Sequence, residues 1–578
     1  MQLEAIYHRP GNSYCYPYDG HTIHIRLRTK KDDLQVVKAL YGDKYDWDNT
    51  VREAELHKLA SDELFDYWQT EVDPPHLRLR YAFELVAGEQ TVWYTEKGFF
   101  KERPTDPLQF FDYPFLWSNE VLQPPAWVKD AIFYQIFPDR FANGDQTNDP
   151  DQVRPWEDSN PGPQDFYGGD LQGVLDRLDY ISSLGVNAIY FTPLFEAKTN
   201  HKYDTTDYLK VDPQFGDTEL LKKLVKACHD RGIRVILDAV FNHCGYWFAP
   251  FQDVLKQGEA SRFRDWFHIK QFPLARTPRP SYHCFAFESH MPKLNTVHPE
   301  VRAYLLDVAQ YWIRECDIDG WRLDVANEID HEFWREFRKA CKGVKPDFYI
   351  LGEIWHDAMP WLQGDQFDAV MNYPATEAII DFFAKGTIDA EQFSFQVNKL
   401  LANYPQQVNE ATFTVLGSHD TPRLLTVAQN DKKAMLAVLF QFIFLGAPCI
   451  YYGDEVGMTG GPDPDCRKPM VWEEKKQNRE LLDFYQELIS FRTNHRALQE
   501  GSFQIIYANH RQLVVQRKHA SEQLYICFNN SEQEETFSFE WMQQDTAPIT
   551  VLGNGTYTIE KDEITVSLPA FGWMIVRN

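Results

Sequence analysis

Basic residues are scarce in this chain relative to acidic ones. Its 578 residues include 58 Lys and Arg against 85 Asp and Glu, which gives a formal net charge of −27. Nucleic acids and anionic membranes are bound through basic stripes, so we expect neither as a partner. Long apolar runs are also missing, because the longest, 435–452, is interrupted by Gln441, Gly446 and Pro448. We expect a buried helix followed by a strand there, and no membrane span.

Cysteine is sparse as well. There are nine, with no C-x-x-C pair, and the first six residues show neither the basic nor the apolar segment of a secretory signal. We therefore expect scattered thiols in a reducing compartment and a cytoplasmic location. What the chain does have is 43% hydrophobic and 25% charged residues, the balance of a protein with a packed core.

The length exceeds the roughly 250–300 residues at which one core stops growing, so several domains are expected. Residues 1–121 contain period-two runs such as 22–28 and 77–85, which predict an N-terminal β-sandwich. From about residue 501 short alternating strands return, and they predict a C-terminal all-β domain over 501–578. A Pro-containing hinge at 122–126 leads from the first domain into a different pattern.

Between these domains, short apolar strands alternate with amphipathic helical stretches, which predicts a (β/α)8 barrel over 122–241 and 299–500. The long interval 242–298 predicts an inserted subdomain over the barrel mouth. The predicted helices include 171–184, 218–231, 299–316 and 432–445. The eight predicted strands are 131–138, 187–193, 234–241, 320–327, 348–355, 367–373, 413–420 and 449–455.

Ionisable residues follow several of these strands. The third, fourth, fifth and seventh strands run into 238–243, 320–324, 352–355 and 418–421, and reactive groups of such barrels gather at these strand ends. Any one Asp could simply cap the next helix, and any one His could be a satisfied polar residue. Burying so many charged groups together is costly, however, so their coincidence favours a functional site.

The chemistry that this cluster predicts is retaining glycoside hydrolysis. Asp324 would act as nucleophile and Glu353 as general acid and base, with their carboxyl groups about 5–5.5 Å apart. Arg322 lies two residues before Asp324 and so faces the same side of the strand; we expect its charge to lower the pKa of Asp324. Asp420 would be the third essential acid, and His243 and His419 would bind sugar hydroxyls.

These segments resemble the α-amylase family, glycoside hydrolase family 13. Its four hallmark segments are matched in order by 238–243, 320–328, 352–355 and 418–421, and 185–193 and 446–455 look like its strand-two and strand-eight signatures. The resemblance covers about residues 125 to 500.

Residues 291–295 (Met-Pro-Lys-Leu-Asn) and 325–328 (Val-Ala-Asn-Glu) are similar to the neopullulanase, cyclomaltodextrinase and maltogenic amylase group. That resemblance implies cleavage of α-1,4 and, less, α-1,6 links in cyclodextrins, pullulan and maltooligosaccharides, with some transglycosylation. It also implies a homodimer in which the N-terminal sandwich of one subunit covers the active site of the other. Gly417 and Pro422 depart from the group, whose close members carry an acidic pair there.

The resemblance implies further substrate-binding residues. Tyr203 would stack beneath the reacting sugar. The same region would be lined by His201, Asp463 and Arg467, and the acceptor side would be shaped by Trp355, Asn327 and Glu328.

A structural Ca²⁺ site is also expected. Residues 143–149 offer hard oxygen ligands at short spacing, although the stretch alone reads as a polar turn. Members of the family bind Ca²⁺ through this loop together with a Gly-Gly-Asp like 168–170. The implied ligands are Asn143, Asp145, Asn148, Asp149, the Gly168 carbonyl and Asp170.

Two alternatives stay open at this point. A metal-dependent barrel hydrolase would use the His and Asp residues as ligands, but such enzymes usually place paired histidines at the first strand, where 134–138 has none. A non-catalytic α-glucan-binding protein could share the fold, although it would have no reason to keep Asp324, Glu353 and Asp420 together.

Overall fold

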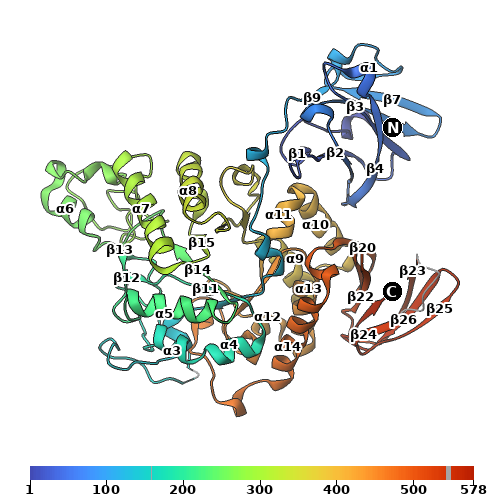
Figure 1. Ribbon diagram of the computed structural model, residues 1–578. Coiled ribbons are helices and arrows are strands. Elements are labelled where there is room, and N and C mark those ends of the chain that lie inside the picture. Colours follow the sequence, from blue (N-terminus) through green and yellow to red (C-terminus); the bar gives the residue numbers. More distant parts are fainter. Residues whose placement is uncertain (158, 542–548) are drawn as a thin grey trace.

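The computed structural model describes residues 1–157, 159–541 and 549–578. Its N-terminal region is an antiparallel β-domain (Figure 1) with the strand order β1-β2-β5-β4-β3-β6-β7-β8, and β9 pairs with β6. The long strand β4 pairs with β3 along its first half and with β5 along its second, so both layers of the predicted sandwich belong to one hydrogen-bonded sheet. The strands are β1 (Cys15–Pro17), β2 (Ile23–Lys30), β3 (Val36–Gly42), β4 (Arg52–Ser61), β5 (Phe65–Val72), β6 (Leu79–Ala87), β7 (Gln90–Thr95), β8 (Gly98–Phe100) and β9 (Phe111–Tyr113).

The middle of the chain forms the predicted barrel. Eight parallel strands follow one another around it in chain order, and a single bridge between Met371 and Phe413 closes the ring. The strands are shorter than the sequence predicted, since each gives way to a loop where its polar residues begin. They are β10 (Phe133–Ile136), β11 (Ala188–Phe191), β14 (Arg234–Ala239), β15 (Gly320–Leu323), β16 (Tyr349–Gly352), β17 (Ala369–Val370), β18 (Phe413–Val415) and β19 (Ala447–Tyr451).

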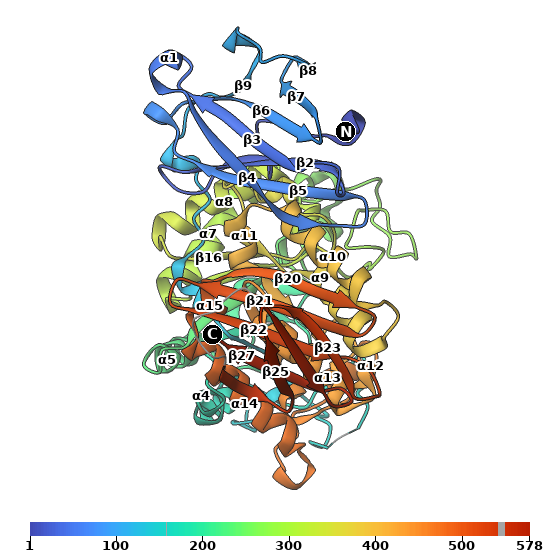
Figure 2. The ribbon, with the colours of Figure 1, turned by 90° about the vertical axis from the view of Figure 1, so that its right-hand side faces the viewer.

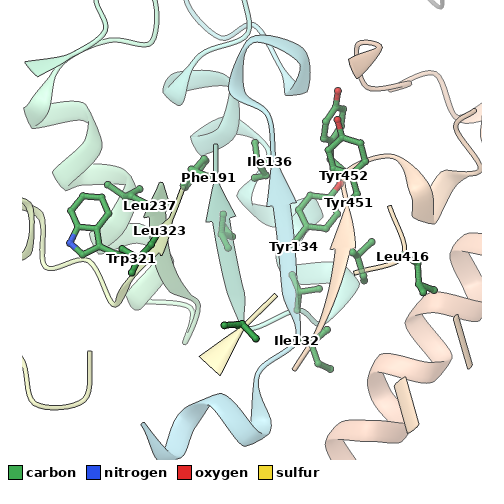
Figure 3. Packing of buried hydrophobic residues seen from close by; sticks show 14 of the residues in the cluster. Ile132, Tyr134, Ile136, Phe191, Leu237, Trp321, Leu323, Leu416, Tyr451 and Tyr452 are labelled. Atoms are coloured by element: carbon green, nitrogen blue, oxygen red, sulfur yellow. The ribbon is translucent and has the colours of Figure 1, made fainter. Parts of the chain in front are cut away.

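The two faces of these strands pack into two different cores, as their period of two requires. Figure 3 shows side chains of the outer face, such as Ile136, Phe191 and Leu237, which pack against the surrounding helices. Alternate residues such as Tyr190 and Ile236 fill the barrel interior. Toward the carboxyl ends of the strands the interior residues change from apolar to ionisable, and there the candidate site begins.

The helices lie outside the barrel, and the predicted ones are found. The segment 171–184 is split at Arg177 (φ −103°, ψ 7°), while Asp217 caps α5 by accepting a hydrogen bond from Leu220 N. No described helix is both long and apolar enough to cross a membrane. The main helices are α3 (Leu171–Asp176), α4 (Leu178–Leu184), α5 (Thr218–His229), α7 (Pro299–Cys316), α8 (His331–Val344), α9 (Tyr373–Ile379), α10 (Ala390–Asn403), α11 (Gln406–Ala411), α13 (Asp431–Ile443) and α14 (Arg479–Asn494).

Two insertions leave the barrel at its carboxyl-terminal end. The hairpin of β12 (Phe195–Ala197) and β13 (Thr205–Val211) follows β11. The segment 242–298 follows β14, contains α6 (Ala249–Gln257) and returns to its own start through a bridge between His243 and Lys293. Both insertions therefore contribute residues to the mouth of the barrel.

The C-terminal domain is all-β, as predicted. Among its described residues, a first sheet has the order β20-β21-β22-β27-β24 and a second has β23-β26-β25, and their facing side chains form a separate core. The strands are β20 (Ser502–Asn509), β21 (Gln512–His519), β22 (Glu522–Asn529), β23 (Glu535–Glu540), β24 (Ile549–Gly553), β25 (Thr556–Glu560), β26 (Glu563–Leu568) and β27 (Trp573–Arg577).

The N-terminal domain rests on α10 and α11 of the barrel (Figures 1 and 2). The buried guanidinium of Arg26 donates to the carbonyls of Ala402 and Tyr404, at 3.0 and 2.7 Å. In return, Gln407 Nε2 donates to the carbonyls of Pro17 and Tyr18, each at 2.8 Å. These are buried polar contacts, so the two domains are joined by specific hydrogen bonds as well as by apolar packing.

Candidate active site

The expected acids stand at the carboxyl ends of neighbouring barrel strands. Asp324 follows β15 and Glu353 follows β16, and both side chains are buried. The parallel register pairs Asp238 with Arg322 directly across β14 and β15. All four side chains therefore point into the barrel interior, with Asp324 and Glu353 two residues further toward the carboxyl ends of the strands than Asp238 and Arg322.

Arg322 lies at the centre of these four side chains. Its Nη1 donates to Asp324 Oδ1 at 3.0 Å and to both oxygens of Asp238, at 3.1 and 3.0 Å. Its Nη2 lies 2.8 Å from Glu353 Oε2. One guanidinium group thus holds three carboxylates, and it keeps the candidate nucleophile and the candidate acid close together, in keeping with the short separation of about 5–5.5 Å in retaining enzymes.

This sharing corrects the expectation about Asp324. Burial raises its pKa well above the ordinary value, Arg322 opposes that rise, and the neighbouring Glu353 and Asp238 add to it. Burial likewise raises the pKa of Asp238 to about 6, against the opposing effect of Arg322. The expected lowering of the Asp324 pKa was wrong because burial outweighs the effect of Arg322, whose charge is also shared among three carboxylates.

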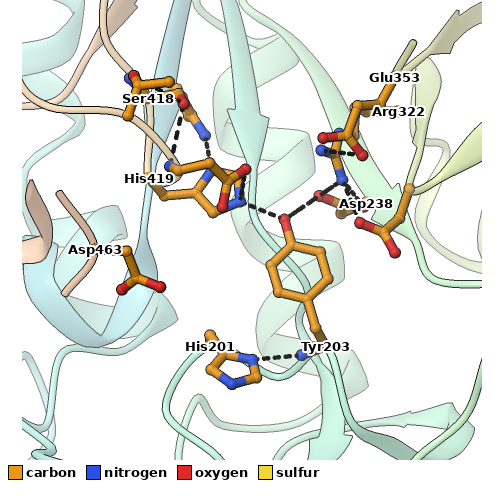
Figure 4. Close-up of polar contacts among 12 residues, drawn as sticks. His201, Tyr203, Asp238, Arg322, Glu353, Ser418, His419 and Asp463 are labelled. Atoms are coloured by element: carbon orange, nitrogen blue, oxygen red, sulfur yellow. Dashed lines mark hydrogen bonds and ion pairs between the residues drawn. The ribbon is translucent and has the colours of Figure 1, made fainter. Parts of the chain in front are cut away.

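A chain of hydrogen bonds runs beneath the pocket (Figure 4). Gln135 Nε2 lies 2.7 Å from His419 Nδ1, and His419 Nε2 lies 2.6 Å from the hydroxyl of Tyr203. That hydroxyl donates to Asp238 Oδ2 at 2.9 Å. Because the Gln135 amide donates to Nδ1, the imidazole carries its proton on Nε2. Burial lowers the pKa of His419, so this ring is neutral and fixed in one tautomer.

The two oxygens of Glu353 differ in their partners. Oε2 accepts from the Val325 amide at 3.0 Å and also pairs with Arg322. Oε1 has one partner, the Trp355 indole N–H at 3.1 Å. Oε1 is therefore the less engaged oxygen of Glu353.

These groups open into a pocket of about 320 Å³. Asp324 Oδ2 is buried there without a hydrogen-bond partner, and so is His243 Nε2. Burial lowers the pKa of His243 to about 3, so its free nitrogen is neutral. The pocket is lined by His201, Tyr203, His243, Phe285, Met291, Asp324, Val325, Glu353, Trp355, Asp420, Asp463 and Arg467.

Asp420 lies opposite the Arg322 cluster. Its Oδ1 pairs with Arg467 at 3.3 Å, and Arg467 also pairs with Asp463 at 3.0 Å. Burial raises the pKa of Asp420, and Arg467 opposes the rise. Pairing with Arg467 fixes an acid here that can accept hydrogen bonds from sugar hydroxyls.

The other predicted substrate-binding residues are not part of the pocket lining. Arg322 and His419 lie beneath the pocket, while Asn327 and Glu328 lie in a short turn beside it. Asn327 contacts His356 at 3.2 Å and Glu328 pairs with Lys293 at 3.4 Å. Neither side chain lines the pocket, so their predicted acceptor role stays a prediction.

Sequence reasoning missed residues that the structure puts at the centre. Asp238 was named only as the start of a segment, although counting the register of adjacent parallel strands would have placed it against Arg322. Tyr190, whose hydroxyl donates to Asp238 at 2.7 Å, lies opposite Ile236 in the register, so counting strand pairs would not have found it. Gln135 and Tyr373, which stacks on Trp355 with ring centres 3.6 Å apart, left no signal beyond their strand position.

Pro422 lines a neighbouring, more apolar pocket of about 380 Å³.

The residues expected to bind Ca²⁺ lie together near the start of α3. Asn143 Oδ1 and Asn148 Oδ1 are buried acceptors without a donor, and Gly168 comes so close that a Cβ there would stand 2.3 Å from Asp149 Oδ1. Burial and the nearby Asp170 raise the pKa of Asp149. Unpaired oxygens in an acidic setting fit a hard cation.

Asp170 and Asp145 are engaged otherwise in this structure. Asp170 caps α3 through Gly173 N and also accepts from the amides of Gly144 and Asp145. The Asp145 carboxylate accepts from Thr147. Their role as ligands stays a prediction.

The metal-dependent alternative finds no support in the geometry. Within 1–157, 159–541 and 549–578, no three or more His, Cys, Asp and Glu side chains are arranged to hold a metal ion. His419 instead bonds to Gln135 and Tyr203, and the ring of His243 stacks on Phe285.

Fold and site together define a carbohydrate-cleaving enzyme on a (β/α)8 barrel. Residues 135–501 match the family described as alpha amylase, catalytic domain, and residues 1–117 match the alpha amylase N-terminal ig-like domain. The chain belongs to the α-amylase family and is a glycoside hydrolase. The non-catalytic alternative is set aside by this membership.

Individual relatives resemble the chain over nearly its whole length. A cyclomaltodextrinase of Geobacillus thermopakistaniensis is 54% identical, covering 100% of this chain and 99% of its own. Neopullulanase 2 of Thermoactinomyces vulgaris is 49% identical, covering 88% of this chain and 87% of its own. A solved structure of a cyclomaltodextrinase, 54% identical, superposes with a TM-score of 0.96 over 100% of both chains.

Proposed function

We propose that the protein is a retaining hydrolase of cyclodextrins, pullulan and maltooligosaccharides. It would cleave α-1,4 links and, less readily, α-1,6 links, with some transfer to sugar acceptors. One observation carries the proposal: Arg322 holds Asp324 and Glu353 side by side, both residues line one pocket, and each keeps one less engaged oxygen, Oδ2 and Oε1. The names of the relatives support the substrate class.

The reaction would proceed in two displacements. Asp324 Oδ2 attacks the anomeric carbon, and the glycosidic C–O bond breaks with its electron pair going to the departing oxygen, which takes the proton from Glu353 Oε1. Water then attacks the glycosyl-enzyme ester and gives a proton back to Glu353, releasing the sugar and the Asp324 carboxylate. A sugar hydroxyl in place of that water gives transglycosylation.

The surrounding residues would bind and orient the sugar. Tyr203 presents its ring to the pocket while its hydroxyl is held from below. His243 Nε2 and the Asp420 carboxylate would bond to hydroxyls of the reacting ring, and Trp355 would pack against the acceptor sugar.

The deciding experiment is to incubate the protein with β-cyclodextrin, pullulan and starch and to follow product sizes and anomers by NMR. We expect α-anomers as the first products and faster turnover of β-cyclodextrin and pullulan than of starch. First products of the β-configuration would contradict the double displacement. Turnover of starch alone would contradict the proposed substrate class.

We further propose a structural Ca²⁺ held by oxygens of Asn143, Asp145, Asn148, Asp149, Gly168 and Asp170. When bound, it would supply positive charge that ties the 143–149 loop to the start of α3. The three carboxylates of this site alone form no metal-holding group among the described residues, so the support comes from the unpaired amide oxygens of Asn143 and Asn148. Adding Ca²⁺ at 100 times its dissociation constant should stabilise the fold by about 2.7 kcal/mol, seen as a higher Tm that EGTA reverses. An Asn143→Leu variant should lose the response; an unchanged Tm in the parent protein would contradict the site.

We also propose a cytoplasmic homodimer. All nine cysteines lie in described residues and are free thiols, which suits a reducing compartment. Exposed aromatic side chains occur on the N-terminal domain (Tyr45) and beside the pocket (Phe287 and Trp355), and burying them against a second copy would be favourable. Light scattering at working concentration should give twice the chain mass; a monomeric mass would contradict the dimer.

A further inference from the structure

Two sequence segments mark the subgroup, 291–295 and 325–328, and each supplies one residue to the pocket, Met291 and Val325. The structure joins them through Lys293. Its ammonium group donates to the carbonyl of Glu328 at 2.9 Å and lies 3.4 Å from the Glu328 carboxylate. It also donates to the side-chain oxygen of Asn242, which follows β14. Lys293 thus ties the inserted segment and the end of β14 to the turn that follows the nucleophile.

That turn is strained at the residue next to Asp324. Val325 has φ 46° and ψ 44°, a left-handed conformation that β-branched residues rarely adopt. In this conformation its amide donates to Glu353 Oε2 at 3.0 Å. Strained residues of this kind persist only where the surroundings hold them in place, so the contacts of the turn determine whether this hydrogen bond is kept.

The turn is held from two sides. On the barrel side, the indole N–H of Trp334 donates to the carbonyl of Ala326 at 2.9 Å. On the pocket side, Lys293 supplies the contacts to Glu328. The backbone of Lys293 is itself fixed. Its amide donates to the carbonyl of His283 at 3.0 Å, and Lys293 forms an antiparallel bridge with His243. Lys293 is therefore a rigid clamp with a mostly covered ammonium group, not a mobile surface lysine.

We propose that Lys293 is a positioning residue for the acid of the reaction, which it serves by clamping the 325–328 turn so that the Val325 amide stays on Glu353 Oε2. This proposal rests on the proposed function, because it takes Glu353 as the acid and base. With Oε2 fixed by Val325 and Arg322, the proton is carried on Oε1, toward the leaving oxygen. Without the clamp, Val325 relaxes and the Glu353 carboxyl group loses its fixed orientation.

The test compares substrates that need an acid with one that does not. Lys293→Met removes the ammonium group and keeps the length of the side chain. For maltotriose, whose leaving group must be protonated, we expect kcat/KM to fall about 10–100-fold, a fraction of the total that general acid catalysis contributes. For maltosyl fluoride, whose leaving group needs no proton, kcat/KM should change by less than about threefold. Hydrolysis of the glycosyl-enzyme still needs Glu353 as base, so kcat for maltosyl fluoride should fall. Azide attacks the glycosyl-enzyme without a base and should restore that kcat.

Three further variants make the outcome unambiguous. Lys270→Met is the matched control, because Lys270 lies in the same inserted segment and donates to a backbone carbonyl, that of Pro280, away from the turn; it should behave as the parent. Asn242→Ala weakens the same clamp from the other side and should give the Lys293→Met pattern more mildly, also if Lys293→Met does not fold. Glu353→Gln tests the acid itself and should show the strongest dependence on the leaving group.

The outcomes separate the two ideas. If Glu353→Gln shows the leaving-group dependence but Lys293→Met and Asn242→Ala lower kcat/KM equally for both substrates, or not at all, Lys293 does not position the acid while the proposed function stands. If Glu353→Gln lowers kcat/KM equally for both substrates, Glu353 is not the acid, and both proposals fall together.

Discussion

Asp238 is completely buried beneath the pocket, and replacing it by Asn removes its charge while keeping its shape. The variant resembles the protonated form of the residue. Tyr190 and Tyr203 can still donate to the amide oxygen as they do to Asp238 Oδ2. The amide NH2 group then faces Arg322 Nη1, which donates to Asp238 Oδ1, so the ionised carboxylate is reported by the part of the stability difference that varies with pH.

The size of the effect follows from the pKa. Burial raises the pKa of Asp238 from 3.8 to about 6, roughly two pH units at about 1.36 kcal/mol each, or about 3 kcal/mol. Because the folded pKa is the higher one, this stability is fully present below pH 3.8 and is lost as the pH rises to about 6. Above that, the wild type carries the whole penalty, whereas Asp238→Asn carries none.

The assay is denaturant unfolding of both proteins from pH 4 to 7.5, followed by tryptophan fluorescence. The free energy of unfolding of Asp238→Asn relative to wild type should rise by about 3 kcal/mol across this range. Asp319→Asn is a control of opposite sign. Burial alone would raise the pKa of Asp319, but hydrogen bonds and charges from His229 and Lys345 bring it well below the ordinary value. That control should therefore lose stability at pH 7.5.

A difference in stability between wild type and Asp238→Asn that stays constant with pH would contradict a raised pKa of Asp238. It would mean that Asp238 is ionised at low pH, and therefore that Arg322 pairs more strongly with Asp238 than with Asp324 and Glu353. Turnover should fall in Asp238→Asn, because Arg322 loses one of the carboxylates that hold its guanidinium group in place.

Three other results are expected. Asp324→Asn should keep its circular dichroism spectrum and lose turnover of β-cyclodextrin on the order of a thousandfold or more; substantial residual activity would mean that another group is the nucleophile. Tyr203→Phe should lower the free energy of unfolding by about 1–3 kcal/mol, because the hydroxyl bonds to both Asp238 and His419; an unchanged value in a urea titration would argue against that network. In a profile of kcat/KM against pH, activity should fall on the acid side at a pH above about 4, since burial raises the pKa of Asp324 and the nucleophile must be ionised; an acid limb below that pH would show that Arg322 prevails after all.

Much of this arrangement could be predicted from the sequence, because a parallel barrel brings the ends of its strands together. Asp324, Glu353 and Asp420 were found from strand order alone, without knowledge of any side-chain contact. The period of two placed Arg322 on their side of the barrel. These inferences depend only on local backbone geometry, which the pattern of apolar residues determines.

What could not be predicted depends on contacts between strands and loops. The pairing of Arg322 with Asp238 follows from the register of β14 against β15, and the burial of Asp324 among these groups raises its pKa where a lowering was expected. The pairing of Glu328 with Lys293 after the left-handed Val325 was not foreseen, and the expected place of Glu328 at the acceptor side stays a prediction. Side-chain direction after such a turn is set by contacts from distant segments.

The barrel has one weak seam. On either side of β17, whose strand is only two residues long, neighbouring strands share few pairings, and the ring is closed by the Met371–Phe413 bridge alone. The helices α10 and α11 span that seam in the chain, and they are the ones on which Arg26 and Gln407 fasten the N-terminal domain. The N-terminal domain therefore supports the barrel where its strands share the fewest pairings. Deleting this domain to obtain a minimal enzyme would also remove that support from the barrel wall next to Glu353.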